Sequence, residues 1–129
     1  MLRTGWRAGP ADHDGGPVFV AITEFRPQRR RDMLAVARAG LRLGRGWPEL
    51  PGAVGMWLWC QPALGRTGSV SVWRDEEALR GFVRWPPHVE VIKRFRDEGT
   101  LNSHGWWTPS FDQERIWRLA RERLASPRV

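Results

Sequence analysis

The segments of this chain that have the pattern of β-strands carry apolar side chains on both faces, and few folds accommodate that. These segments are VFVAITEF (18–25), AVGMWLWCQP (53–62), TGSVSVWR (67–74) and LNSHGWWTP (101–109). A sheet with one face in water alternates apolar and polar residues, but VFVAI, GMWLWC and GWW place apolar residues on both sides. Both faces of the predicted sheet must therefore be covered.

Helical patterns lie between and after these strands. The first covers RDMLAVARAGLRLG (31–44) and has one apolar and one arginine-rich face. The second begins after Asp75, which we expect to cap it, breaks at the WPP triplet (85–87), and continues to about Glu98. The last begins after Asp112 and presents a third apolar stripe.

The order of these elements predicts an α+β fold of the ferredoxin-like type. It is β-α-β-β-α-β with one four-stranded antiparallel sheet, followed by a C-terminal helix. We expect residues 1–17 to form a flexible lead-in and residues 18–125 to form a single domain. Two helices cover only one face of such a sheet, so we predict a homodimer in which a second copy covers the other. The alternative is that the C-terminal helix folds back over this face.

Composition limits the cellular setting and the partners. The chain has 129 residues, no apolar run of the roughly 18 residues that a membrane span needs, and no apolar signal-peptide core. We therefore expect a cytoplasmic protein without a membrane span. The net charge of +7 favours an acidic partner or a substrate with carboxylates. Because its arginines are scattered and only 29–31 form a run, we do not expect a nucleic-acid partner.

One histidine stands out because it lies on an apolar helix face. In FVRWPPHVEVIKRF (82–95), His88 shares a face with Val91, Ile92 and Phe95. The positive end of the helix dipole and burial both disfavour imidazolium, so we predict a neutral ring that can bind a metal or act as a general base. The plain alternative is a partly buried histidine that bonds a backbone carbonyl and has no further function.

Other polar residues offer weaker candidates. His104, on the last strand, shares a face with Asn102 and Trp106 and could lie at a dimer seam or in a site. Cys60 excludes an internal disulfide, and its position in an apolar strand predicts a raised pKa and an inert thiol. Cx2C, HExxH and GxGxxG motifs are absent from the sequence, so we expect neither a closed zinc site nor a dinucleotide site.

The second half of the chain resembles a known superfamily. SVSVWRDEEALRGFVRWPPHVEVIKRFRDEG followed by WWTP is similar to an uncharacterised family of the dimeric α/β-barrel superfamily, which includes the antibiotic-biosynthesis monooxygenases. It is also similar to the spheroidene monooxygenase group, in which a strand ending in S-x-W-x-D/E leads into a helix with an F-x-x-x-x-P/A-H element. The matching residues here are Ser71, Trp73, Asp75, Phe82, Pro87 and His88. The resemblance covers 67–109, and Thr100-Leu101 replaces an aromatic pair of that group.

This resemblance implies a homodimeric, monooxygenase-like oxidoreductase with one apolar pocket per subunit, between the sheet and its helices. The pocket would bind haem or a flat hydrophobic or aromatic ligand, with His88 as axial ligand of the haem iron or as catalytic base. Its wall and rim would come from Trp73, Phe82, Trp85, Phe95, Trp106 and Arg84. Two alternatives are a cofactorless oxygenase or isomerase, and a dimeric ligand-binding module that is not an enzyme.

Overall fold

The computed structural model describes residues 1–11 and 15–125. Its elements, in chain order, are β1 (Leu2–Arg3), β2 (Arg7–Ala8), β3 (Val18–Pro27), η1 (Arg30–Asp32), α1 (Met33–Arg45), η2 (Trp47–Glu49), β4 (Ala53–Gln61), η3 (Pro62–Leu64), β5 (Arg66–Trp73), α2 (Glu76–Val83), α3 (Pro86–Phe95), β6 (Gly99–Thr108) and α4 (Gln113–Ala125). None of the described helices has the length and hydrophobicity that crossing a membrane requires.

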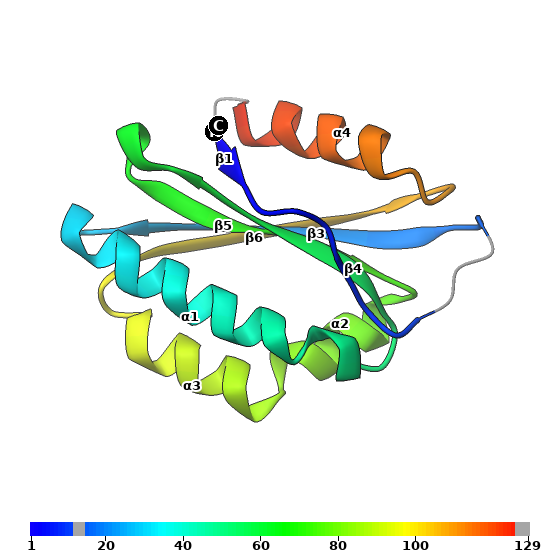
Figure 1. The fold of residues 1–129 in the computed structure, drawn as a ribbon, viewed down its shortest axis with the longest axis horizontal. Helices are drawn as coiled ribbons and strands as arrows, with labels where there is room; N and C mark the ends of the chain where they lie inside the picture. The colour runs from blue at the N-terminus through cyan, green and yellow to red at the C-terminus, as the bar shows by residue number, and fades with distance from the viewer. Residues whose placement is uncertain (12–14, 126–129) are drawn as a thin grey trace.

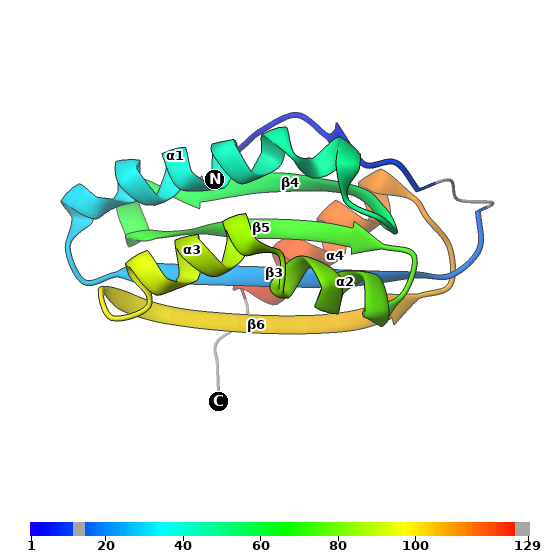
Figure 2. The same ribbon diagram turned by 90° about the horizontal axis from the view of Figure 1, so that it is seen from below.

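The sheet confirms the predicted fold class. Its order is β1-β4-β5-β3-β6, with β2 also paired to β4, and every pairing is antiparallel. The four long strands have the ferredoxin-like arrangement, with the first and third of them side by side in the centre (Figure 2). Each lies within two residues of its predicted ends. The predicted break in the second helical pattern separates α2 from α3.

Helices cover both faces of the sheet. α1, α2 and α3 lie on one face and α4 lies alone on the other (Figure 1). The alternation of β3 explains the division, because Val18, Val20 and Ile22 point toward α4, where they join Ile116 and other apolar residues in the largest core cluster. The odd-numbered residues of β3 face the other three helices.

The coverage by α4 removes the reason for expecting a homodimer. We predicted a second copy because two helices leave one face of the sheet open. In the structure α4 buries Ile116, Ala120 and Leu124 against that face. A single chain therefore covers both faces of its own sheet. The alternative arrangement, in which the C-terminal helix folds back, is the one found (Figure 1).

The segment before residue 12 is ordered against the sheet, which corrects the expected flexible lead-in. β1 and β2 pair with the outer edge of β4, placing Leu2 opposite Cys60. Between these strands, the ring of Trp6 lies 4.5 Å from that of Trp57. Trp6 occupies the space over Gly55, where a Cβ would collide with its indole ring. His13 lies outside the described residues.

A buried ion pair fastens the end of α4 to the sheet. Nη1 of Arg66 donates to Oε2 of Glu24 at 2.7 Å and to the carbonyl oxygen of Leu124 at 2.8 Å. The side chains of Glu24 and Arg66 are 1% and 7% exposed. A cation at the last carbonyls of a helix also complements the helix dipole. The pair therefore links β3, β5 and α4 at one point.

Replacing Arg66 by alanine is expected to lower the free energy of unfolding by about 3 kcal/mol, since the buried Glu24 carboxylate then keeps only the half-exposed Arg26 and the Leu124 carbonyl loses its donor. Urea denaturation followed by tryptophan fluorescence measures the change. Arg38→Ala, on the exposed side of α1, is the matched control and should stay within about 0.5 kcal/mol of the unmodified protein. An Arg66→Ala midpoint equal to that of the control would contradict a structural role for the pair.

Candidate functional site

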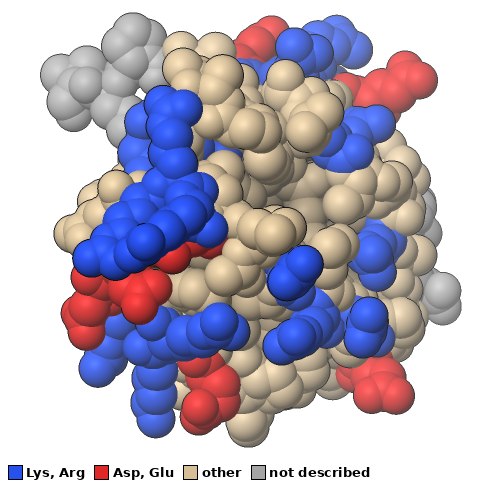
Figure 3. Space-filling model, turned by 60° about the vertical axis from the view of Figure 1, so that its left-hand side comes forward, with Lys and Arg blue, Asp and Glu red and all other residues tan. Residues whose placement is uncertain are grey.

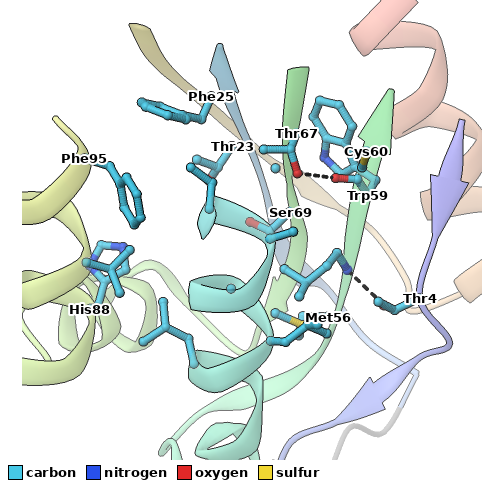
Figure 4. A pocket seen from close by; sticks show the side chains of 18 of the residues that line it. Thr4, Thr23, Phe25, Met56, Trp59, Cys60, Thr67, Ser69, His88 and Phe95 are labelled. Atoms are coloured by element: carbon cyan, nitrogen blue, oxygen red, sulfur yellow. Dashed lines mark hydrogen bonds between the residues drawn. The ribbon is translucent and has the colours of Figure 1, made fainter. Parts of the chain in front are cut away.

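A cavity of about 400 Å³ lies between α1, α3 and the sheet. Its lining is mostly apolar and includes Val36 and Gly40 of α1, Val91 and Phe95 of α3, and Phe25 of β3. Figure 4 shows His88 and Phe95 facing the strands that carry Thr67, Ser69 and Cys60. The volume is in the range typical of small-molecule sites, roughly 300–1,000 Å³.

Small side chains explain why this layer is hollow. On its inner side α1 presents Ala37 and Gly40, and beneath it the sheet presents Thr23, Gly68 and Ser69. None of these residues fills the distance between a helix and a sheet, whereas tryptophans and branched residues fill the opposite face under α4. The cavity therefore follows from the residue sizes on the two sides of the sheet.

His88 occupies the start of α3, where the chain turns out of α2. Pro86 and Pro87 precede it in the first turn, and Trp85 at the N-cap makes no side-chain capping bond. Nδ1 of His88 lies 3.1 Å from the carbonyl oxygen of Val83, the last residue of α2. Because a carbonyl only accepts, Nδ1 carries the proton and Nε2 keeps a free lone pair in the neutral ring.

The environment of His88 favours this neutral form. Burial lowers its pKa below the ordinary value of 6.5, and the bond to the Val83 carbonyl opposes that shift only in part. Its ring packs against Phe82, with 4.4 Å between centroids. Nε2 has no hydrogen-bond partner among residues 1–11 and 15–125. A histidine that served only to bond a backbone carbonyl would explain the position of Nδ1. It would give Nε2 no role, although His88 belongs to the cavity wall.

Of the predicted wall residues, Phe82 and Phe95 line the cavity together with His88. Trp73 is fully buried beside it, where its Nε1 donates to Oγ of Ser71 at 2.9 Å and its ring packs on Trp47. These tryptophan contacts fill the core next to η2. Trp73 therefore packs behind the wall residue Trp47 and does not line the cavity itself.

Two of the predicted site residues, Arg84 and Trp85, lie outside the cavity on the helical side of the sheet. Trp85 packs outside the cavity, against Phe82 and over Gly46, whose missing side chain makes room for it. Arg84 is exposed and pairs with Glu77 at 3.4 Å, on the solvent side of α2. Trp85 thus belongs to the core cluster around Trp47 and Trp73, and Arg84 to the surface.

Trp106 is on the α4 side of the sheet, opposite the cavity. The guanidinium of Arg123 in α4 lies 4.2 Å from its ring centroid and donates to Nε2 of His104 at 2.8 Å. Strand alternation places His104 and Trp106 on one face, as predicted, but that face is the one that α4 covers. Neither residue belongs to the cavity.

Trp47 is a wall residue that the sequence pattern does not single out. Trp47 is 1% exposed and lines the cavity, with its ring 5.1 Å from that of Phe82. Its indole Nε1 is buried and has no hydrogen-bond partner among the described residues. A buried donor without an acceptor is costly, and Nε1 of Trp59, another lining residue, is in the same state.

Two further features restrict the chemistry of the site. Burial raises the pKa of the Cys60 thiol, an effect that the nearby N-terminal amine opposes, so the thiol at this wall is poorly nucleophilic as predicted. Within the part of the chain that the structure describes, no group of three or more His, Cys, Asp or Glu residues could hold a metal ion.

Several solved structures share this fold at low sequence identity. Protein SO0527 from Shewanella oneidensis matches with a TM-score of 0.64 and 12% identity, over 76% of this chain and 96% of its own. SnoaB, a cofactor-independent oxygenase from Streptomyces nogalater, matches with a TM-score of 0.53 and 18% identity, over 69% and 90%. An antibiotic biosynthesis monooxygenase matches with a TM-score of 0.59 and 11% identity, over 73% and 99%.

The predicted resemblance is therefore confirmed for the fold. The chain has the ferredoxin-like architecture of the antibiotic biosynthesis monooxygenases, and a quarter to a third of it lies outside each match. The sequence matches no family model and no curated protein.

His88 is expected to titrate below pH 6.5 and to carry its proton on Nδ1 when neutral, because burial disfavours its charged form. Two-dimensional ¹⁵N–¹H NMR of histidine-labelled protein measures both, and His88→Asn identifies the signal by its loss. Since the unfolded chain then binds the proton more readily, the contribution of His88 to stability is complete above pH 6.5 and is lost as the pH falls from there toward the folded pKa. A pKa above 6.5, or an Nε2–H tautomer, would contradict the geometry.

Proposed function

We propose that the cavity binds a flat aromatic ketone and supports its oxidation by molecular oxygen without a bound cofactor. The observation that carries this proposal is a neutral imidazole on an apolar wall, with Nδ1 tied to the Val83 carbonyl and Nε2 unpaired. A base held in one orientation, with a pKa below the working pH, is suited to removing a proton from a bound molecule.

The reaction follows from what His88 and Trp47 offer. Nε2 of His88 removes a proton from a CH₂ group that is activated by a ring carbonyl, and the negative charge spreads onto the carbonyl oxygen. The Nε1–H of Trp47 is buried in the wall without an acceptor, and a small turn of the ring on ligand binding would let it donate to that oxygen. Both residues contact Phe82, so they border the same part of the cavity. The electron-rich anion is then oxidised by O₂, and the overall change, CH₂ plus O₂ to C=O plus H₂O, needs no other reductant.

The apolar lining supports this chemistry in two ways. It excludes water from the carbanion, which water would otherwise protonate, and it provides an apolar space beside α1 and α3 for fused rings. SnoaB, which shares the fold, is a cofactor-independent oxygenase, and that likeness adds to the proposal.

Haem fits the donor but not the surroundings. His88 Nε2 is free, and a hydrogen bond from the other ring nitrogen to a backbone carbonyl, as Nδ1 makes here, is typical of an axial ligand. However, three of the aromatic walls expected for a porphyrin, Trp73, Trp85 and Trp106, lie outside the cavity. A cavity of about 400 Å³ also suits a molecule of two or three rings better than four pyrroles with two propionates. We therefore derive no step through haem.

A matched pair of substitutions separates the catalytic role of His88 from its structural one. His88→Asn keeps a donor for the Val83 carbonyl and removes Nε2, so we expect unfolding free energy within about 1 kcal/mol of the unmodified protein. Oxygen uptake with dihydroxyanthrone, measured by electrode on metal-free protein, should fall by about a hundredfold or more. His88→Gln, which loses the Nδ1 bond, should be less stable. Equal uptake by the His88→Asn variant would contradict the proposed base, and tight binding without any uptake would favour a ligand-binding module.

Titration with haem tests the other candidate cofactor. Because the expected walls are absent from the cavity, we expect no Soret band that differs between the unmodified protein and His88→Asn. A sharp band that the substitution abolishes would show that His88 ligates iron and would overturn the cofactor-free proposal.

A further inference from the structure

The charged residues of the cavity wall are all basic. Arg3 and Arg96 are its only charged members among the described residues, and no Asp or Glu lines it. Arg3 turns away, since its guanidinium lies 4.7 Å from the ring centroid of Trp117 in α4. Arg96, the C-cap residue of α3, is therefore the one charged side chain left to face a ligand.

Arg96 lies where the cavity meets solvent. Arg96 and Leu101 of β6, which is 42% exposed, mark this mouth, and the exposed lining residues Leu2 and Leu41 show that the cavity also opens beside α1. Phe95, which precedes Arg96 in the chain, is buried and lines the cavity together with His88 of the same helix. No ion pair within the described residues engages Arg96, although Asp97 and Glu98 follow it in the chain.

The same end of the molecule carries further positive charge. α1 begins there, after the arginine run 29–31, and α3 ends there with Lys93 and Arg94 in its last turn (Figure 1). On the face that brings this end forward, Lys and Arg cover more of the surface than Asp and Glu (Figure 3). Such a field attracts anions to the mouth and weakens as salt is added.

We propose that the ligand of this cavity is an aromatic acid, with its rings beside His88 and its carboxylate or other anionic group at Arg96. This inference rests on the proposed ligand cavity and specifies the substrate class. A guanidinium at the mouth binds an anion by charge-assisted hydrogen bonds while water still solvates it, so the charge need not enter the apolar interior. The acid group thereby sets which end of the molecule enters first.

Two fluorescent probes with the same rings test this assignment. Anilinonaphthalene sulfonate carries an anionic group, and N-phenylnaphthylamine does not. Both become fluorescent in apolar sites. We expect the sulfonate to bind the unmodified protein more tightly, and Arg96→Gln to weaken its binding by about five- to tenfold while changing that of the neutral probe by less than about twofold. Added salt should weaken binding of the sulfonate probe to the unmodified protein more than its binding to the Arg96→Gln variant.

Control variants separate failure of this inference from failure of the cavity itself. Arg38→Gln, an exposed arginine of α1 outside the cavity, should leave both affinities unchanged. Ala37→Phe should fill the cavity and abolish binding of both probes. Equal affinities for the two probes, unaffected by Arg96→Gln, would overturn the acid proposal and leave the cavity intact. If neither probe binds, or if Ala37→Phe leaves binding unchanged, the ligand cavity fails and the acid proposal with it.

Discussion

A sheet that is apolar on both faces must be covered on both, and the rest of this structure depends on how one chain achieves that. α4 closes one face with buried apolar side chains, and Arg66, paired with Glu24, holds the end of the helix by the carbonyl of Leu124. The N-terminal segment completes the same layer with Trp6. Because the chain covers this face itself, the fold needs no second copy for its hydrophobic core.

The two layers differ in how well they are filled, and the difference places the site. Beneath α4 the tryptophans of β4 and the valines of β3 and β5 interlock. Beneath α1, small residues such as Ala37, Gly40 and Ser69 stand among the larger apolar ones and leave the cavity. His88 has a role in both structure and chemistry there. Its Nδ1 fastens α3 to the end of α2, and this bond also fixes which nitrogen remains available.

Local patterns in the sequence predicted what local physics decides. Alternation and proline positions located the four long strands, the proline pair located the bend between α2 and α3, and the dipole and burial predicted a neutral His88. Long-range packing was beyond such patterns. Two-residue strands such as β1 and β2 have no periodicity to detect, and they form only because β4 offers an open edge.

The site was predictable only in part for the same reason. Alternation grouped His104 with Trp106 but could not say which face of the sheet they share, and that depended on where α4 docks. The sequence does not distinguish a tryptophan on a cavity wall from one in a filled core, so Trp47 could not be identified as a wall residue. Its unpaired Nε1 became visible only once its neighbours were known.

The most direct test of this account is a crystal structure of the protein under xenon pressure, since xenon occupies dry apolar cavities large enough to hold it. We expect xenon between α1 and the sheet, close to His88 and Phe95, and α4 seated on the opposite face of the same chain. Collapse of α1 onto β5 with no xenon bound there, or a second copy in place of α4, would contradict it.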